Sequence, residues 1–251
     1  MVQKIRFFEQ DPLAATYPRP RLPVLPVLST RSFHETTEAE FPSRFFGADC
    51  VALRTGRAAI AQALRLAGVG PGHEVLIPGY HCGSMVEPAL WARADIAFFD
   101  IHPDLTLDYG DLERKLSART RVIIAPHYFG FPQALDPLLV MRERHGFLVI
   151  EDCSHALFGS SAGHVLGSRG DFAITSTSKW FAAIEGGALC CNDSPRLSER
   201  LPSLSRSARY EVRAALATLT EATDYGRLPL LKPFVGLANG RGPSSITGLL
   251  C

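Results

Sequence analysis

The sequence has almost no excess of charge of either sign. Its 26 Lys and Arg residues face 25 Asp and Glu residues, which gives a formal net charge of +1. A surface of this composition does not attract polyanions or anionic lipids, so neither nucleic acid nor a membrane is an expected partner. Long apolar runs are also absent, since none approaches the roughly 20 residues that cross a bilayer. The first residues, MVQKIR, lack the apolar stretch of a signal peptide, and we expect a cytoplasmic protein.

Cysteine is sparse and has no metal-binding spacing. The six cysteines stand at positions 50, 82, 153, 190, 191 and 251, and none of them forms a CxxC motif. This spacing argues against a zinc site or a redox dithiol, and we expect no bound metal. Without a secretion signal, the expected state is reduced thiols that pack as small apolar groups.

The chain does have the material for a sizeable core. Of its 251 residues, 46% are hydrophobic and 20% are charged, as in ordinary globular domains. Six prolines between positions 12 and 42 exclude a long helix in residues 1–45, which we interpret as an N-terminal arm. Residues 46–193 form the expected main domain. Residues 194–251 are expected to be a helical segment, broken near Pro202, with an irregular tail after Tyr225.

Short apolar segments alternate with helical patterns in the main domain. The sequence predicts strands over residues 74–78, 96–100, 121–125, 147–152, 172–174 and 188–191. It predicts helices over residues 58–67, 84–92, 109–116, 135–145 and 194–223, the second of them capped by Ser84. This alternation indicates an α/β fold of three layers (α/β/α), with helices on both faces of a mostly parallel central sheet. The ligand site of such a sheet lies at the carboxyl ends of its strands.

Two residues near such strand ends carry the main chemical signal. Asp152 ends the apolar run that begins at Phe147, and Lys179 follows the hydroxyl-rich residues 175–178. A lysine amine forms a Schiff base with the aldehyde of pyridoxal 5'-phosphate (PLP), and a carboxylate keeps the pyridine nitrogen of that cofactor protonated. Each residue alone is compatible with a surface lysine or a turn aspartate, but the pair with its neighbours predicts a PLP site.

Other residues fit a phosphate group beside this pair. Thr55, Gly56 and Arg57 open the predicted helix at residues 58–67, where backbone N–H groups and the helix dipole attract a phosphate. The hydroxyl of Thr55 offers a further donor. Ser176, which follows the strand at residues 172–174, is among the nearest hydroxyls to Lys179.

Several aromatic and polar residues also follow predicted strands or precede Gly186-Gly187. They are Tyr80, His81, Cys82, His127, His155 and Glu185. A flat group in residues 80–82 is placed to stack on a cofactor ring. His155 is placed to contact the ring oxygen or to orient Asp152, whereas His127 fits a cofactor or substrate contact and a structural role equally by pattern. The two glycines permit a tight turn.

The motifs TGRAA, IPGYH, PHYFG, EDCSHA, STSK and EGG, in this order, resemble the DegT/StrS family of sugar aminotransferases over residues 47–193. The resemblance implies that residues 46–193 are the PLP-binding large domain of a fold type I transferase. It implies a homodimer that moves an amino group from an amino acid, glutamate, to a nucleotide-linked keto-sugar in polysaccharide or amino-sugar biosynthesis. Family members usually carry a further C-terminal domain, which we expect to be truncated here.

The resemblance also implies a role for individual residues. Lys179 corresponds to the Schiff-base lysine and Asp152 to the partner of the pyridine nitrogen. The backbone N–H groups of Gly56 and Arg57 and the hydroxyl of Ser176 correspond to phosphate donors.

The sequence departs from the family pattern in three places. The usual ring-stacking position falls on Cys82, which leaves Tyr80 or His81 for that role. His155 stands where the family often has glutamine, and two residues are missing between Asp171 and Lys179 relative to the usual loop.

His127 and Glu185 are candidate substrate residues. A dehydrating branch of the family replaces the lysine by histidine, and Lys179 argues against that branch.

Three other interpretations stay open. A PLP-fold remnant without its lid would bind or regulate rather than catalyse, although the intact Asp152 and Lys179 oppose this. A different PLP reaction, such as that of a carbon–sulfur lyase or a decarboxylase, would use the same fold. An α/β nucleotide-binding module without PLP has no GxGxxG or Walker motif in its favour.

Overall fold

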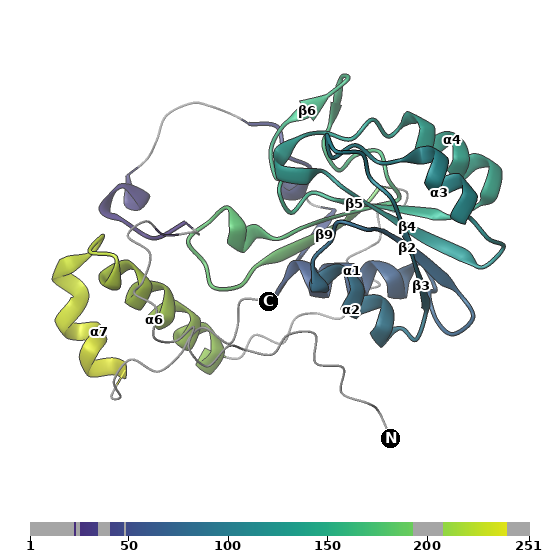
Figure 1. The fold of residues 1–251 in the computed structure, drawn as a ribbon. Helices are drawn as coiled ribbons and strands as arrows, with labels where there is room; N and C mark the ends of the chain where they lie inside the picture. Colours follow the sequence, from purple (N-terminus) through teal and green to yellow (C-terminus); the bar gives the residue numbers. More distant parts are fainter. Residues whose placement is uncertain (1–22, 24–25, 35–40, 48, 193–207, 240–251) are drawn as a thin grey trace.

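The structure is a computed structural model that describes residues 23, 26–34, 41–47, 49–192 and 208–239 (Figure 1). Its centre is a seven-stranded sheet with the strand order β1-β9-β8-β5-β4-β2-β3. The strands are β1 (Cys50–Leu53), β2 (Glu74–Pro78), β3 (Asp95–Phe99), β4 (Thr120–Pro126), β5 (Leu148–Asp152), β8 (Phe172–Thr175) and β9 (Gly187–Cys191). β9 runs antiparallel to both of its neighbours, and every other neighbouring pair in this sheet is parallel. The predicted α/β class with a mostly parallel sheet is confirmed.

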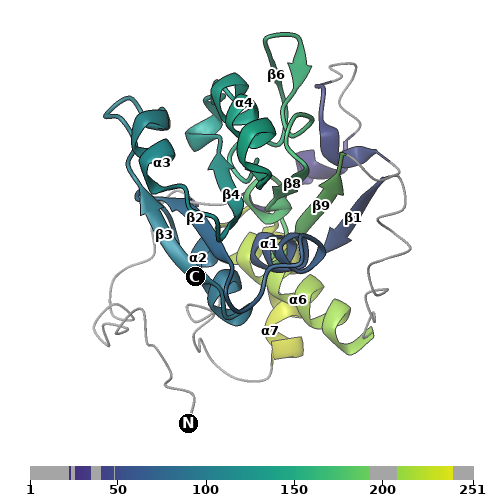
Figure 2. The same cartoon turned by 90° about the vertical axis from the view of Figure 1, so that its right-hand side faces the viewer.

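Helices cover both faces of the sheet (Figure 2). One face carries α1 (Gly56–Leu66) and α2 (Gly83–Trp91), and the other carries α3 (Tyr109–Lys115) and α4 (Asp136–His145). Successive side chains of a strand point to opposite faces, so Val75 and Ile77 pack with α1 and α2 while Leu76 packs with α3 and α4. The central strands are mostly apolar because both of their faces are buried.

The boundaries of the elements predicted between residues 56 and 192 agree with the structure to within two residues. The cap predicted at Ser84 is wrong. Cys82 occupies the N-cap position of α2 and makes no side-chain capping bond, while Ser84 lies inside the first turn. The Oγ atom of Ser84 lies 2.7 Å from the Sγ atom of Cys82, so its hydroxyl faces back toward the cap residue.

β1 is a strand that the sequence pattern did not predict. It pairs with β9 so that Cys50 stands opposite Cys190. A four-residue edge strand is defined by its partner more than by its own pattern. The Cα atoms of the two cysteines lie 4.3 Å apart, and a disulfide joins them. The expectation of reduced thiols is therefore wrong for this pair, whereas Cys82, Cys153 and Cys191 are free thiols.

The segment after residue 207 contains more helix than the sequence predicts. α6 (Ala208–Asp224) matches the C-terminal part of the helix predicted over residues 194–223, whose break near Pro202 lies outside the described residues. A 3-10 helix, η6 (Pro229–Leu231), and α7 (Lys232–Asn239) correct the expectation of an irregular tail. Pro229 and Pro233 are compatible with these helices because both stand in a first turn, where the missing N–H has no intrahelical acceptor.

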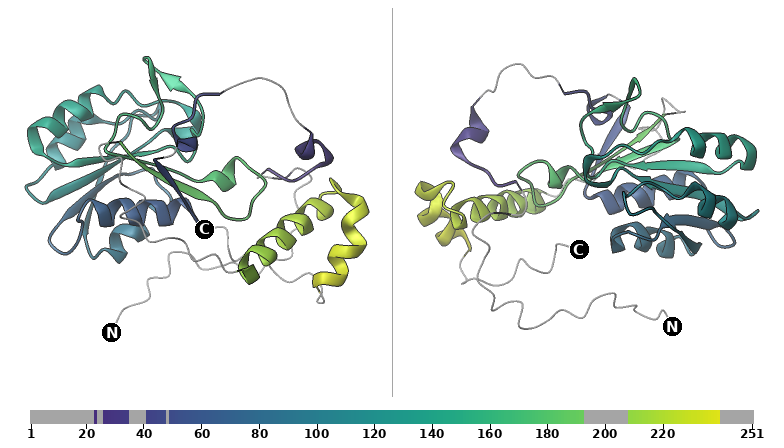
Figure 3. Two further views of the ribbon diagram at one scale, coloured as in Figure 1. Left: turned by 180° about the vertical axis from the view of Figure 1, so that it is seen from behind. Right: turned by 45° about the horizontal axis from the view of Figure 1, so that its top comes forward.

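Short elements complete the fold (Figure 3). The 3-10 helices η4 (Tyr128–Gly130) and η5 (Thr177–Lys179) follow β4 and β8, and β6 (Ser160–Ser161) and β7 (His164–Val165) form a hairpin. The arm contributes η2 (Thr30–Phe33) and η3 (Arg44–Phe46), and η2 lines a surface pocket together with Gly226 and Arg227 after α6. Among the described residues, no helix is long and apolar enough to cross a membrane.

Candidate active site

The carboxyl ends of neighbouring parallel strands bring the predicted site residues to one edge of the sheet. Asp152 is the last residue of β5, and Ser176 directly follows β8, which is the next strand in the sheet. Tyr80 follows β2, and its ring lies 5.5 Å from that of Tyr128, which follows β4. The topology therefore assembles this edge from segments that are far apart in the sequence.

Asp152 is held in a buried position at this edge. Only 5% of its surface is exposed. The backbone N–H of Ser154 donates to Oδ1 of Asp152 across 2.8 Å, and the carbonyl of Asp152 accepts the N–H of His127 across 3.0 Å. These bonds fix both the main chain and the carboxylate, so the charge of Asp152 has a defined place.

Lys179 lies on η5, one short turn after Ser176. Its N–H donates to the carbonyl of Ser176 across 3.1 Å. The side chain is exposed, and its Nζ atom lies 3.0 Å from Nε2 of His155. The structure thus brings together Lys179, His155 and, three residues before His155, the strand-end carboxylate of Asp152.

His155 is fixed by a further contact. Its ring stacks on Phe129, with centroids 5.5 Å apart and 17° between the planes. Burial, and after it the charge of Lys179, lower the pKa of His155, while Asp152 acts in the opposite direction. Phe129 is a site residue that sequence reasoning missed, because nothing in its local pattern indicates which ring it contacts.

The start of α1 forms a narrow polar corner beside Ser176. Thr55 is the N-cap, and its Oγ1 accepts the N–H of Ala58 across 3.0 Å. A Cβ atom added to Gly56 would lie 3.2 Å from Cβ of Ser176 and 3.6 Å from Oγ of Ser154. The first N–H groups of a helix have no acceptor within it, so this corner offers donors and hydroxyls to an anion.

Gly187 and Gly186 matter here for close approach rather than for an unusual backbone angle. A Cβ at Gly187 would lie 2.4 Å from the carbonyl of Thr55, and a Cβ at Gly186 would lie 2.2 Å from Oγ1 of Thr177. Neither glycine has a positive φ. The two glycines therefore allow β9 to pass directly against the start of α1 and against η5.

The side chains of Arg57 and Glu185 point to ionic partners. Nη1 of Arg57 lies 2.8 Å from Glu87 on α2, whereas the buried Nε of Arg57 has no hydrogen-bond partner among the described residues. Nε of Arg54 lies 3.4 Å from Glu185. Glu185 is thereby placed near the corner formed by α1 and β9, and its predicted substrate role stays a prediction.

Residues 80–82 lie at the edge but differ in their surroundings. The ring of Tyr80 is exposed and lies near the rings of Tyr128 and Phe129. His81 stacks on Phe98 with centroids 4.7 Å apart, which occupies one face of its ring. Cys82 carries no ring and caps α2. Of the three, Tyr80 belongs to the same aromatic group as Phe129, so it is the residue best placed to flank a ring.

The side chain of His127 contacts Glu151, on the face of the sheet opposite to the side chain of Asp152. Its Nε2 lies 3.0 Å from Oε2 of Glu151, and its Nδ1 accepts the N–H of Gln133 across 3.0 Å. The ring is 1% exposed. Both ring nitrogens are therefore engaged in the fold, and the structure does not bring His127 to Lys179.

Glu151 is the second residue that sequence reasoning missed. Besides His127, the backbone N–H groups of Gly167, Arg169 and Gly170 donate to its carboxylate. Burial by itself raises the pKa of Glu151, but these bonds outweigh it and the net shift is downward. The available signal was its position in an apolar strand, where an acidic residue needs partners.

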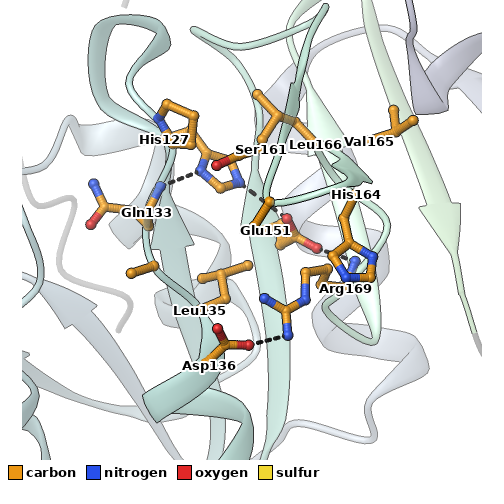
Figure 4. A pocket seen from close by; sticks show the side chains of 13 residues that line it. His127, Gln133, Leu135, Asp136, Glu151, Ser161, His164, Val165, Leu166 and Arg169 are labelled. Carbon is orange, nitrogen blue, oxygen red and sulfur yellow. Dashed lines mark hydrogen bonds and ion pairs between the residues drawn. The ribbon is translucent and has the colours of Figure 1, made fainter.

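A cavity of about 180 Å³ lies beside this network (Figure 4). Figure 4 shows Glu151 and His127 in its wall, together with an ion pair between Arg169 and Asp136. His127, Glu151 and the buried thiol of Cys153 have potential metal-ligand atoms within 4.8 Å of one another. The imidazole and carboxylate atoms already serve the hydrogen bonds above, and burial raises the pKa of Cys153, so we assign no metal to this group.

The residues on the side of β5 that carries Asp152, which we call the front, fit PLP. A buried carboxylate at the end of β5, an accessible lysine on η5 and a glycine-lined corner with hydroxyls at the start of α1 match the nitrogen, aldehyde and phosphate of that cofactor. The close packing at Gly56 and Gly187 leaves backbone rather than side chain at the corner, as contact with a phosphate requires.

Comparisons with known proteins point the same way. A model of the DegT/DnrJ/EryC1/StrS aminotransferase family matches residues 29–219. The L-glutamine:scyllo-inosose aminotransferase of Streptomyces griseus is 35% identical over 167 residues, which make up 64% of this chain and 39% of that protein. A UDP-N-acetyl-3-dehydro-alpha-D-glucosamine 3-aminotransferase of Acidithiobacillus ferrooxidans is 29% identical over 178 residues, or 69% of this chain and 48% of that protein.

Solved structures of similar proteins share the fold. DesV of S. venezuelae is 29% identical with a TM-score of 0.57, and the match covers 63% of this chain and 45% of that chain. The PLP form of the putative sugar aminotransferase Spr1654 of Streptococcus pneumoniae is 26% identical with a TM-score of 0.55, covering 60% and 43%. The chain spans about half the length, or less, of the curated relatives it matches.

Proposed function

The chain belongs to the DegT/DnrJ/EryC1/StrS aminotransferase family, and we propose that it is a PLP-dependent aminotransferase. The observation that carries the proposal is the convergence of Asp152, His155 and Lys179 at the carboxyl edge of the sheet, beside the start of α1. A lysine and a buried carboxylate in this arrangement are what binding of PLP through its aldehyde and ring nitrogen needs.

When bound, PLP supplies an aldehyde that takes up amino groups and a ring that accepts electrons. The carboxylate of Asp152 would accept the N–H of the ring, and the N–H groups of Gly56 and Arg57 and the hydroxyl of Ser176 would donate to the phosphate. Nζ of Lys179 would hold the aldehyde, and the freed amine would act as the base that takes the proton from the donor's α-carbon and as the acid that delivers it to the C4′ carbon of the cofactor. Tyr80 would flank the ring.

The names of relatives support a proposal for the substrates. We propose a keto-sugar linked to a nucleotide, or a keto-cyclitol, as the acceptor, because relatives are named for both kinds of substrate. The donor is glutamate or glutamine, since several relatives are named as L-glutamine aminotransferases. The active form is a cytoplasmic homodimer, and Glu185 is retained as a candidate substrate residue.

The test is an absorption spectrum of the purified protein with added PLP, before and after borohydride. We expect a visible band that borohydride removes, with the mass of the cofactor recovered on the peptide that contains Lys179. Folded protein without such a band contradicts the proposal. A cofactor mass on Lys4, Lys115 or Lys232 instead contradicts the assignment of Lys179.

A second candidate is a binding or regulatory protein built on the same domain. The observation in its favour is that the chain spans only 35% to 54% of the length of the curated relatives it matches. It is distinguished by a half-reaction with glutamate or glutamine, in which an enzyme converts bound PLP to its aminated form and a binding protein leaves the spectrum unchanged.

A further inference from the structure

The side chain of Arg57 has a buried donor without an acceptor. Arg57 stands in the first turn of α1, one residue after Gly56. Its Nε atom is buried and makes no hydrogen bond, and among the described residues that are not exposed it is the only buried side-chain nitrogen or oxygen in this state. An unpaired buried donor is unfavourable for a fold, most of all when it belongs to a charged group. This nitrogen therefore indicates a ligand with an acceptor atom.

Glu87 fixes the place of the guanidinium. Its Oε2 atom lies 2.8 Å from Nη1 of Arg57, and both side chains are largely buried. Glu87 stands in the second turn of α2, but its carboxylate reaches back toward the first turn, since a Cβ atom added to Gly83 would lie 3.9 Å from Oε1 of Glu87. The guanidinium of Arg57 is thus held between the first turns of α1 and α2.

The first turn of α1 is also the corner that we propose for the phosphate. A Cβ atom added to Gly56 would meet Ser176 and Ser154 there. The side chain of a helical residue leans toward the N-terminus of its helix, so the stem of Arg57 runs toward the same end as the free N–H groups of the first turn. The corner therefore has a guanidinium beside its backbone donors and its hydroxyls.

The chemistry of a guanidinium suits a second oxyanion at this place. It carries five N–H donors in a rigid plane, so one nitrogen can hold Glu87 while another donates to a ligand. Hydrogen bonds from a guanidinium to phosphate oxygens are short and strong because both groups are charged. Of the groups of PLP, the phosphate has several acceptor oxygens and fits donors that arrive from different directions.

We propose that the side chain of Arg57, held by Glu87, binds the phosphate of PLP through its Nε–H group. The proposal rests on the proposed function and deepens it, because the donors assigned there are the backbone N–H groups of Gly56 and Arg57 and the hydroxyl of Ser176. It makes the phosphate the part of the cofactor that this guanidinium recognises. Its effect must therefore differ between PLP and pyridoxal, which has the same ring and aldehyde but no phosphate.

Borohydride trapping of PLP and of pyridoxal by Arg57→Met tests this difference. Methionine keeps an unbranched stem and removes the N–H donors. We expect the concentration for half-maximal trapping to rise roughly tenfold or more for PLP and to stay within about twofold of the wild type for pyridoxal. Arg65→Met, at an exposed position in the last turn of the same helix, is the matched control and should match the wild type with both.

Equal weakening of PLP and pyridoxal by Arg57→Met, or no weakening of either, overturns the proposal. If the variant leaves both unchanged and instead raises the concentration of amino donor needed in the half-reaction, Arg57 binds a substrate anion, and the assignment to the cofactor is wrong.

A crystal structure of the wild type with bound PLP covers the case that Arg57→Met fails to fold. We expect Nε of Arg57 to lie within about 3.2 Å of a phosphate oxygen. A phosphate more than about 4 Å from Nε, with water as the acceptor instead, overturns the proposal.

These outcomes separate the proposal from the proposed function. If the wild type traps neither PLP nor pyridoxal, the function is refuted, and the role of Arg57 with it. If both are trapped on Lys179 and Arg57→Met weakens them equally, the function stands and only the role of Arg57 is refuted. A loss of affinity for PLP alone supports both.

Discussion

The two sides of β5 at its carboxyl end treat two adjacent carboxylates in opposite ways. Glu151 points to the rear, where four N–H groups saturate it: one from the His127 ring and three from the backbone of residues 167–170. Asp152 points to the front and accepts the N–H of Ser154 beside the pair formed by His155 and Lys179. Both carboxylates are buried.

The difference teaches that burial alone does not assign a carboxylate to chemistry. A carboxylate saturated by fixed donors serves the fold, because moving a ligand against it would break bonds that already exist. A carboxylate with fewer fixed donors is available to a ligand. We therefore assign a structural role to the rear network, which comprises His127, Glu151 and residues 167–170, and propose a chemical role for the front.

The largest expected effect is on the front side. Lys179→Ala should abolish the trapping of PLP by borohydride, because Lys179 is the amine that we propose for the aldehyde, and should leave the circular dichroism spectrum unchanged. Lys115→Ala, on α3, is the matched control and should trap normally. Trapping in Lys179→Ala at the wild-type level would remove the basis for assigning the site.

Asp152→Asn should separate catalysis from binding. An amide cannot hold the ring nitrogen protonated, so we expect turnover to fall by about 100-fold or more while the affinity for PLP falls by less than about tenfold. Steady-state assays and a PLP titration measure the two quantities. Equal losses of both would show that Asp152 only binds.

Glu151→Gln, in contrast to Asp152→Asn, should affect mainly the stability of the fold. Removing the charge from the rear network leaves strong donors without their acceptor, and we expect a loss of about 3 kcal/mol in the free energy of unfolding. Urea titration of the folded protein checks it, and Asp152→Asn should lose less than about 1 kcal/mol in the same experiment. A Glu151→Gln variant as stable as the wild type would show that the rear network does not hold the fold.

The dependence of stability on acidic pH tests the same structural role of Glu151. The pKa of Glu151 in the folded state lies below its ordinary value of 4.5, so around that pH the unfolded chain binds more protons than the folded one. The stabilisation by this carboxylate is fully present above about pH 4.5 and is lost as the pH falls through its folded-state pKa. Thermal unfolding between pH 3 and pH 6 should therefore show a steeper decline for the wild type than for Glu151→Gln, and parallel curves would refute the linkage.

The sequence was sufficient for those parts of the fold that local pattern defines. The buried strands and the helices between them follow from periodicity, and the strand order then brings Gly56, Asp152, Ser176 and Lys179 to one edge. β1 and the disulfide between Cys50 and Cys190 depend on pairing with β9 across 140 residues, which no local pattern reports. η6 and α7 were not predicted because Pro229 and Pro233, which stand in their first turns, interrupt the helical pattern.

The different roles of the residues on the two sides of β5 could likewise not be predicted from the sequence. The pattern marked His127 as a candidate substrate residue and gave no role to Glu151, because the donors that saturate Glu151 come from a loop 16 to 19 residues later. The role of Phe129 depends on one backbone angle and on a ring from another loop. Contacts of this kind are set by the packing of loops, and spacing along the chain does not report them.

The smallest expected effect concerns the ring-stacking position on the front side, where this chain has a cysteine. Cys82 stands where the family resemblance places a ring, and it is exposed at the start of α2. Cys82→Phe should raise the affinity for PLP by roughly fivefold, because one aromatic contact contributes about 1 kcal/mol. The matched control is His81→Ala, which should leave the affinity unchanged, since the ring of His81 already stacks on Phe98. If His81→Ala weakens PLP binding and Cys82→Phe does not strengthen it, His81 rather than Tyr80 is the residue that flanks the ring, and the front side is organised around α2 rather than around Phe129.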